Sequence, residues 1–228
     1  MWTMWLVAFS IFAACKVASL IPAERAGWRT TLAYLCLWPG LNAQSFLHST
    51  KVAPTSAGEW AFATLTTTFG GLLLTINDSW ARMVGVVFLL HFGLFHLLSL
   101  AWRSAGVDAK PLMNWPILAT SLADFWGRRW NTAFRDLSYQ LVFKPLRRHP
   151  WLATCSVFLF SGLAHDAVMS LPVGSGYGLP TMYFTIQCAG LFLEKKFPAL
   201  KGRIFAAAVL VIPLPLLLHE GFRSLFVR

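Results

Sequence analysis

The sequence predicts an all-α polytopic membrane protein with about seven transmembrane helices, within a range of six to eight, and an amphipathic interfacial helix near residues 121–140. The chain is 57% hydrophobic, and only 12% of its residues are charged, whereas soluble domains carry about 25% charged residues. Its apolar runs approach the length of about 20 residues that crosses a bilayer. Because we find neither an internal repeat nor a low-complexity linker, we expect residues 1–228 to form one domain.

Apolar runs separated by charged or turn-forming residues define the expected spans. The second is short, and Pro213 and Pro215 bend the last. The Gly70-Gly71 pair in the third suits close contact between helices. The seven expected spans are Trp2–Ile21, Trp28–Leu41, Glu59–Ile76, Arg82–Trp102, Trp151–Leu171, Thr181–Leu193 and Ile204–His219.

Basic residues gather in two connectors between these runs, residues 103–150 and 194–203, and the formal net charge is +10. The positive-inside rule places both connectors on the cytoplasmic side of the membrane. The uncharged turn at residues 172–179 then lies outside. Since the charges sit between apolar spans and form no stripe on a soluble face, we exclude nucleic acid as a partner and expect a lipid bilayer.

Residues Ala123–Leu137 are expected to form one amphipathic helix. At 100° per residue, its polar side carries Asp124, Arg128, Asn131 and Arg135, and aromatic residues occupy the opposite side. Asp124 and Arg128 have the spacing of a helical ion pair. From periodicity alone, an ordinary interfacial helix is the favoured interpretation, and a functional role is the alternative.

His165 lies about fourteen residues into an apolar run, beside Asp166. Ionisable residues inside membrane spans are expensive and therefore candidates for function. An imidazole is a general base near neutral pH. Asp166 points about 100° away on a helix, so it is not expected to orient the ring. A core histidine bonded to a neighbouring helix is the alternative.

Metal binding is not expected from the other polar residues of the spans. His91 and His96 are five residues apart, so they do not share a helix face as paired metal ligands do. Contacts between helices explain both, with substrate positioning as the alternative for His96. The four cysteines lie in apolar stretches without a CxxC pair, which indicates packing.

Several motifs together resemble the wax synthase branch of the membrane-bound O-acyltransferases. They are DFWGRRWNTAFRD, FKPLRR, FLFSGLAHD and GYGLPTMYFTIQ, with the earlier GLFHLLSLAWRSAG and WPGLNAQSFL, and the likeness runs from about residue 38 to 196. The tryptophan-asparagine box combined with the later small-residue-His-acid motif is fairly specific. The family more often has glutamate where Asp166 stands, and its members are longer than this chain.

The resemblance implies transfer of a fatty acyl group from acyl-CoA, as co-substrate, to a hydroxyl acceptor in a membrane. A long-chain fatty alcohol is the acceptor that this branch favours. The family's intramembrane histidine and its upstream asparagine correspond to His165, as general base, and Asn131, as its companion. No cofactor is implied, and the oligomeric state stays open. The candidate substrate-binding residues are Arg128, Arg129, Trp130, Arg135, Asp166 and His96.

The residues alone leave two alternatives to a wax synthase function open. A small transporter or a non-catalytic membrane protein would use the histidines as polar contacts along a pathway. Within the enzyme class, the acceptor could be a sterol, a diacylglycerol or a sugar hydroxyl.

Overall fold

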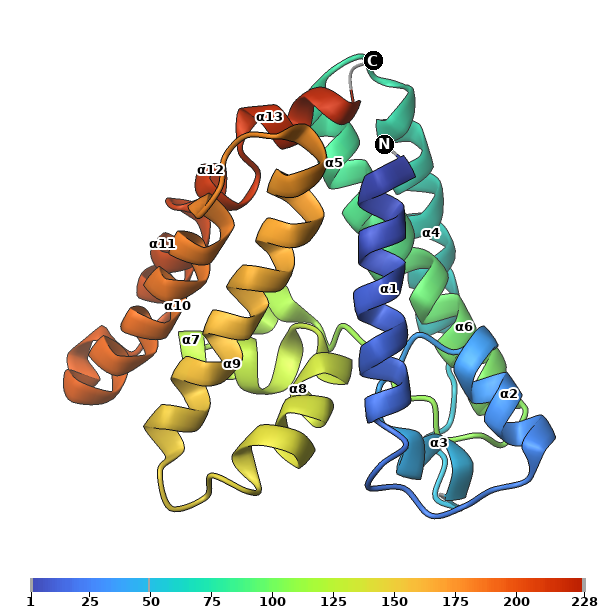
Figure 1. The fold of residues 1–228 in the computed structure, drawn as a ribbon. Coiled ribbons are helices and arrows are strands. Elements are labelled where there is room, and N and C mark those ends of the chain that lie inside the picture. Colours follow the sequence, from blue (N-terminus) through green and yellow to red (C-terminus); the bar gives the residue numbers. More distant parts are fainter. Residues whose placement is uncertain (1, 49, 227–228) are drawn as a thin grey trace. The chain divides into compact units, whose positions relative to one another are not determined.

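The computed structural model describes residues 2–48 and 50–226, and every regular element in that part of the chain is helical (Figure 1). The all-α class is therefore confirmed. The described chain forms two compact units. The first comprises Met1–Ala13, Trp115–Trp130 and Ser138–Arg228, and the second comprises Ala14–Asn114 and Asn131–Leu137. The expectation of a single domain over residues 1–228 stays a prediction.

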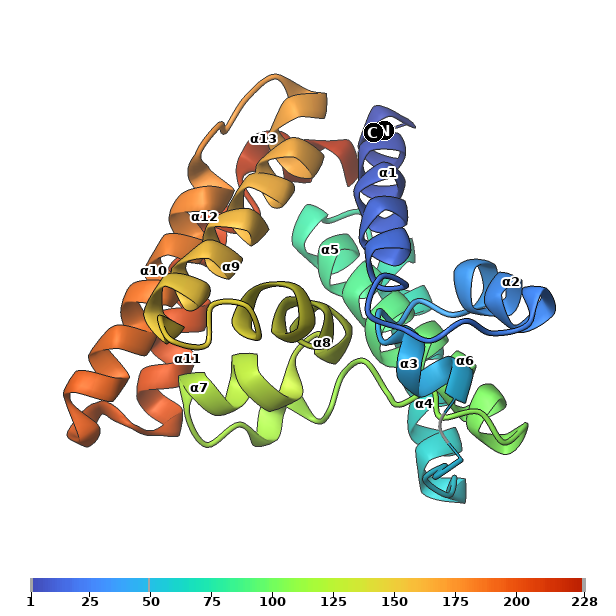
Figure 2. The ribbon, with the colours of Figure 1, turned by 60° about the horizontal axis from the view of Figure 1, so that its bottom comes forward.

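The first unit is built around the hairpin of α9 (Pro150–His165) and α10 (Leu179–Lys196), which lie side by side (Figures 1 and 2). Its other elements are the start of α1 (Trp2–Ala18), η2 (Pro116–Leu118), α7 (Leu122–Asp124), η3 (Phe125–Arg129), η4 (Tyr139–Phe143), η5 (Asp166–Ser170), η6 (Leu171–Val173), η7 (Pro198–Leu200), α11 (Arg203–Val211), α12 (Leu214–Leu217), α13 (Glu220–Arg223) and η8 (Ser224–Phe226).

The core of the first unit lies where this hairpin meets the segment that precedes it in the chain. Phe158 of α9 and Phe184 of α10 are buried together, and Trp126 packs edge-on against Phe158 at 5.5 Å between ring centroids. Buried polar groups fix the neighbouring helices. Gln187 donates to the Val209 carbonyl of α11 (2.8 Å), and the Glu194 carboxylate accepts the first amides of α7.

The second unit consists mainly of apolar helices joined by capped turns. Ser56 and Glu59 form a reciprocal capping box at the start of α4, and Asp78 caps α5. Its elements are the end of α1, α2 (Trp28–Leu37), α3 (Ala43–His48), α4 (Ala57–Thr75), α5 (Ser79–Val87), the π-helical η1 (Phe88–Leu94), α6 (Phe95–Ser104) and α8 (Thr132–Ser138).

Glycines allow α4 to approach the α5–η1 helix at backbone distance. A Cβ added to Gly70 would lie 2.8 Å from both the Gly85 oxygen and the Leu89 Cα, and one added to Gly85 would lie 2.9 Å from the Gly70 oxygen. Thr66 adds a hydrogen bond to the Phe92 carbonyl at 3.0 Å. The expected helix contact at Gly70 is therefore confirmed, whereas Gly71 faces open space.

Two helices are long and apolar enough to cross a membrane, residues 79–104 and 150–173. A third candidate is the pair Arg203–Leu217 and Glu220–Phe226, which is bent by 69°. The expected count of about seven spans is thus not confirmed within the described residues. The other expected spans do form helices, but α1 and α2 are short. Threonines and glycines lower the hydropathy of α4, and α10 contains Gln187 and has a charged end.

The expected interfacial helix is not continuous, which corrects the helical-wheel reading. α7 passes into the π-helical η3, and the helix stops at Trp130 and Asn131 before α8 begins. Trp130 is extended, and Asn131 has a positive φ of 44°. Asp124, Arg128, Asn131 and Arg135 therefore do not share one helical face, because the wheel assumed 100° per residue through a break.

We predict opposite effects for alanine at the two adjacent glycines of α4. Gly70→Ala should destabilise the protein by about 1–3 kcal/mol, because its Cβ meets backbone atoms that cannot move aside. Gly71→Ala, the control, should stabilise it by about 0.5–1 kcal/mol through helix propensity. Thermal unfolding in detergent measures both changes, and equal effects at the two positions would contradict the close approach.

Candidate active site

His165 is the last residue of α9, at the point where the helix widens into the π-helical turn η5. Its Nδ1 lies 2.6 Å from the Ser161 carbonyl oxygen, one turn earlier on the same helix. A carbonyl oxygen only accepts hydrogen bonds, so Nδ1 carries the hydrogen. In the neutral ring Nε2 is then the basic nitrogen, which is the form that a general base requires. Short π-helical turns often occur at functional sites.

The half-buried His165 ring packs against an aromatic cluster of the first unit. The Phe184 ring lies 4.6 Å from it between centroids, and Trp126 packs against Phe184 at 5.9 Å. Trp126 is itself held by a hydrogen bond from its Nε1 to Gln187 at 3.4 Å. Because this surrounding is apolar, it favours the uncharged imidazole over the imidazolium.

Asp166 is engaged by the start of α10. One carboxylate oxygen accepts the Gly178 amide at 2.8 Å and the Ser170 hydroxyl at 3.1 Å, and the other accepts both the amide (3.1 Å) and the hydroxyl of Thr181. Gly178 has a φ of 81°, which suits glycine at this junction. Asp166 therefore caps α10 and ties it to the turn that follows His165. It does not contact the imidazole through any of these bonds.

Asp124 binds two adjacent arginines, of which only Arg128 belongs to the predicted polar side. Its carboxylate accepts Arg128 Nε at 2.8 Å and Arg129 Nε at 2.7 Å, and it also accepts the Thr120 amide at 3.0 Å. Burial raises the pKa of Asp124, but the Thr120 amide and the two guanidinium groups outweigh burial and lower this pKa to about 2. Arg129 also donates to the Trp115 carbonyl, whereas the Arg128 side chain is 72% exposed. Arg128 is thus the more accessible of the two to an anionic substrate.

Asn131 belongs to the second unit, whereas His165 belongs to the first. The Asn131 side-chain oxygen accepts the Phe134 amide at 3.1 Å and so caps α8. Its backbone amide nitrogen lies 3.4 Å from the Met113 sulfur. The residue is exposed, and capping uses only the acceptor end of its carboxamide. The amide nitrogen is the end that can donate to a carbonyl.

The remaining candidate residues have structural partners. Arg135 pairs with the adjacent Asp136 (Nε to Oδ1, 2.8 Å), and Trp130 stacks on Phe125 at 5.5 Å. His96 is a buried residue of α6, and its Nε2 lies 3.9 Å from Glu59 of α4, which also binds Arg103. This is a contact between two helices, and substrate positioning by His96 stays a prediction.

The sequence interpretation missed the groups that orient His165 and its turn. Ser161 is recognisable by its i−4 spacing once the helix is assigned. The buried Ser170 hydroxyl links Asp166 to His219 Nε2, 3.3 Å away on the C-terminal side. No local sequence signal marks that link, because His219 lies 49 residues further along the chain.

Part of the chain is similar to a family of known proteins. Residues 109–186 match the model of the membrane bound O-acyl transferase family, a range that contains Asn131 and His165 but not His96. A probable long-chain-alcohol O-fatty-acyltransferase 6 of Arabidopsis thaliana is 33% identical over 129 residues, which are 47% of this chain and 36% of that protein. The long-chain-alcohol O-fatty-acyltransferase of Simmondsia chinensis is 35% identical over 100 residues, 37% of this chain and 28% of that protein.

An acyl-CoA–sterol O-acyltransferase 1 of Arabidopsis thaliana is also similar, with 34% identity over 71 residues, 27% of this chain and 21% of that protein. The matched parts thus span about a third or less of these relatives. Over the matched residues, the resemblance to the wax synthase branch of the membrane-bound O-acyltransferases is confirmed.

We predict that Asp124 contributes stability only while it is ionised. Its pKa in the folded protein lies below the ordinary 3.8, so this contribution is complete above about pH 4 and is lost as the pH falls through about 2. The unfolding temperature of the wild type should exceed that of Asp124→Asn at pH 5 to 7. The difference should shrink between pH 4 and pH 2. A difference that is independent of pH would contradict the assignment.

Proposed function

We propose that this chain is the histidine-bearing part of a membrane-bound O-acyltransferase that moves a fatty acyl group from acyl-CoA to a hydroxyl acceptor. The observation that carries the proposal is the hydrogen bond from His165 Nδ1 to the Ser161 carbonyl, which leaves Nε2 as the base. The match over residues 109–186 supports the reaction class.

In the proposed reaction, His165 Nε2 removes the proton from the acceptor hydroxyl. The acceptor oxygen then forms a bond to the thioester carbonyl carbon, the carbon–sulfur bond breaks, and CoA leaves as a thiol after taking up the proton. The products are an ester and free CoA. The uncharged imidazole that the aromatic surroundings favour is the state that can start this sequence.

Asn131 is proposed to donate from its amide nitrogen to the acyl carbonyl oxygen, where negative charge develops. A donor of this kind is worth roughly 3 kcal/mol in acyl-transfer enzymes. The cap that it makes on α8 is compatible with this role, because it engages the other end of the carboxamide. Arg128, with its exposed guanidinium, is the proposed contact for the phosphates of CoA.

A long-chain fatty alcohol is the acceptor that we propose, which would make the product a wax ester. The relatives named long-chain-alcohol O-fatty-acyltransferases support this choice. The sterol acyltransferase among the relatives makes a sterol the second candidate.

We predict that His165→Ala and His165→Gln both lower ester formation by about 100-fold to 10,000-fold. Glutamine can still donate to the Ser161 carbonyl but has no basic nitrogen. Loss of activity in His165→Gln would therefore show that the base is needed, and not only the packing of the side chain. The assay uses radiolabelled acyl-CoA with a long-chain alcohol or a sterol in membranes that contain equal amounts of each variant.

His149→Ala is the matched control, because His149 is exposed at the other end of the same helix. It should keep the wild-type rate. Activity close to wild type in His165→Gln would exclude His165 as the base, and preference for the sterol would reassign the acceptor.

A further inference from the structure

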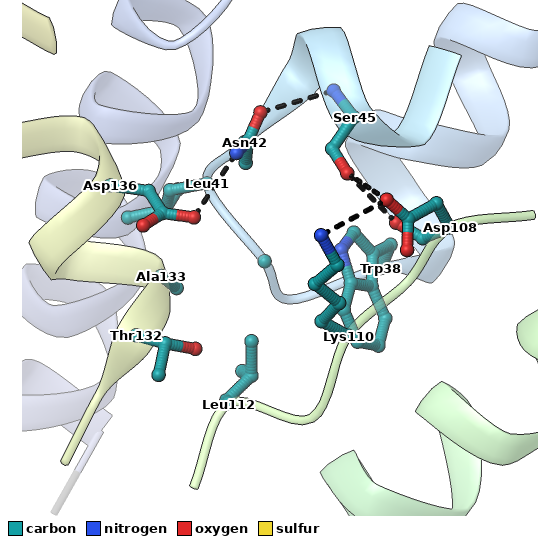
Figure 3. Close-up of a pocket in the computed structure, with 11 residues that line it drawn as sticks. Trp38, Leu41, Asn42, Ser45, Asp108, Lys110, Leu112, Thr132, Ala133 and Asp136 are labelled. Carbon is teal, nitrogen blue, oxygen red and sulfur yellow. Dashed lines mark hydrogen bonds and ion pairs between the residues drawn. The ribbon is translucent and has the colours of Figure 1, made fainter. Parts of the chain in front are cut away.

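The segment from Trp38 to Ser45, part of the WPGLNAQSFL motif, has no role in the reaction as proposed. In the second unit it lies against α8, the helix that Asn131 caps (Figure 3). The contact between them explains what the segment does.

α8 cannot hold Asn131 in place by its own stability. It has seven residues and continues without a break into the π-helical η4, and isolated helices of about twelve residues are marginal in water. Asn131 also adopts a left-handed conformation (φ 44°), which asparagine tolerates better than most residues. The orientation of Asn131 therefore depends on what anchors α8.

One anchor holds the beginning of α8 to residues 111–112 of the same unit. The Thr132 amide donates to the Leu112 carbonyl at 2.9 Å, and the Thr132 hydroxyl donates to the Pro111 carbonyl at 3.1 Å. The adjacent contact is made by the backbone amide of Asn131 with the Met113 sulfur. This anchor fixes the position of the first turn, and a second contact holds the next turn.

The second anchor is the hydrogen bond from Asn42 Nδ2 to Asp136 Oδ2, at 3.1 Å (Figure 3). Asp136 lies one turn beyond Thr132 on α8. Both ends of each side chain are used: Asn42 Oδ1 accepts the Ser45 amide at 3.0 Å, and Asp136 Oδ1 accepts Arg135 Nε at 2.8 Å. The donor and acceptor pattern therefore admits one arrangement of the pair.

Asn42 lies next to a buried aromatic cluster. It precedes α3, whose buried Phe46 packs against Tyr34, Trp38 and Trp102 at 5.1–6.3 Å between ring centroids. Ser45 adds a hydrogen bond of 2.6 Å to the buried Asp108. A contact made by Asn42 therefore transmits the position of this aromatic cluster to α8.

Substrate binding by these polar groups does not fit the space around them. The cavity bordered by Asn42, Asp136 and Thr132 has a volume of about 30 Å³, which is room for only a few water molecules. It is too small for an alcohol or an acyl group. The polar groups here serve to connect segments of the chain.

We infer that Asn42 is a positioning residue for Asn131, acting through Asp136 and the axis of α8. This inference rests on the role proposed for Asn131 in acyl transfer. Asn42 touches no substrate. Its hydrogen bond holds the second turn of α8, the helix that Asn131 caps. Its loss should therefore affect the reaction step more than substrate binding.

The test reverses the polarity of this hydrogen bond in the full chain. Asn42→Asp places two carboxylates face to face, and Asp136→Asn places two amide nitrogens face to face. Each single variant should lower kcat by about tenfold to a hundredfold, with KM within about twofold of the wild type. The double variant restores a donor opposite an acceptor and keeps the bonds to Ser45 and Arg135. It should regain most of the wild-type kcat.

Hydrogen exchange supplies a readout that does not need activity. The amides of residues 134–137 should exchange faster in both single variants and return to the wild-type rate in the double variant. Asn77→Asp, the same change at an exposed position of the same unit, should alter neither kcat nor exchange.

Single variants that expose α8 to exchange but keep the wild-type kcat would overturn the inference. A double variant that does not recover would overturn it too. The wild type is assayed first: if it makes no ester with any acceptor, the proposed function fails, and that result is distinct from a loss confined to the variants.

Discussion

The carboxylate of Asp166 organises the first unit, because four hydrogen bonds converge on it from the start of α10 and from the turn after α9. A partly buried carboxylate needs such partners to offset the loss of its hydration. Here they fix the hairpin at the end where His165 stands. The π-helical turn begins directly after that histidine. The position of the imidazole therefore depends on an ionised neighbour that does not touch it.

Most polar residues of the predicted site are engaged in holding the fold. Asp124 binds two arginines and a backbone amide, Asn131 caps a helix, and Arg135 pairs with Asp136. This follows from the apolar composition, because few polar side chains must satisfy every helix end that the chain buries. A residue in such a protein can serve structure with one atom and chemistry with another. His165 and Asn131 each have one end bonded within the fold and one end suited to a reacting oxygen.

Hydropathy predicted the helical class and the two clearest spans, because long apolar runs without charge allow few other structures. The capping signals at Ser56 and Asp78 are also visible in the sequence. The break at Asn131 was not predicted, although asparagine three residues before an amide that it can cap is a recognised helix start. The bond between Asn42 and Asp136 joins positions 94 residues apart, so no local pattern could have indicated it.

The central claim is that the fold holds His165 with its hydrogen on Nδ1 and its lone pair on Nε2. Nitrogen NMR of the protein labelled with ¹⁵N-histidine, with His165→Gln used to assign the signal, measures this directly. The account predicts a neutral ring at pH 7 with protonated Nδ1 and unprotonated Nε2. A ring that carries its hydrogen on Nε2, or on both nitrogens, would contradict it.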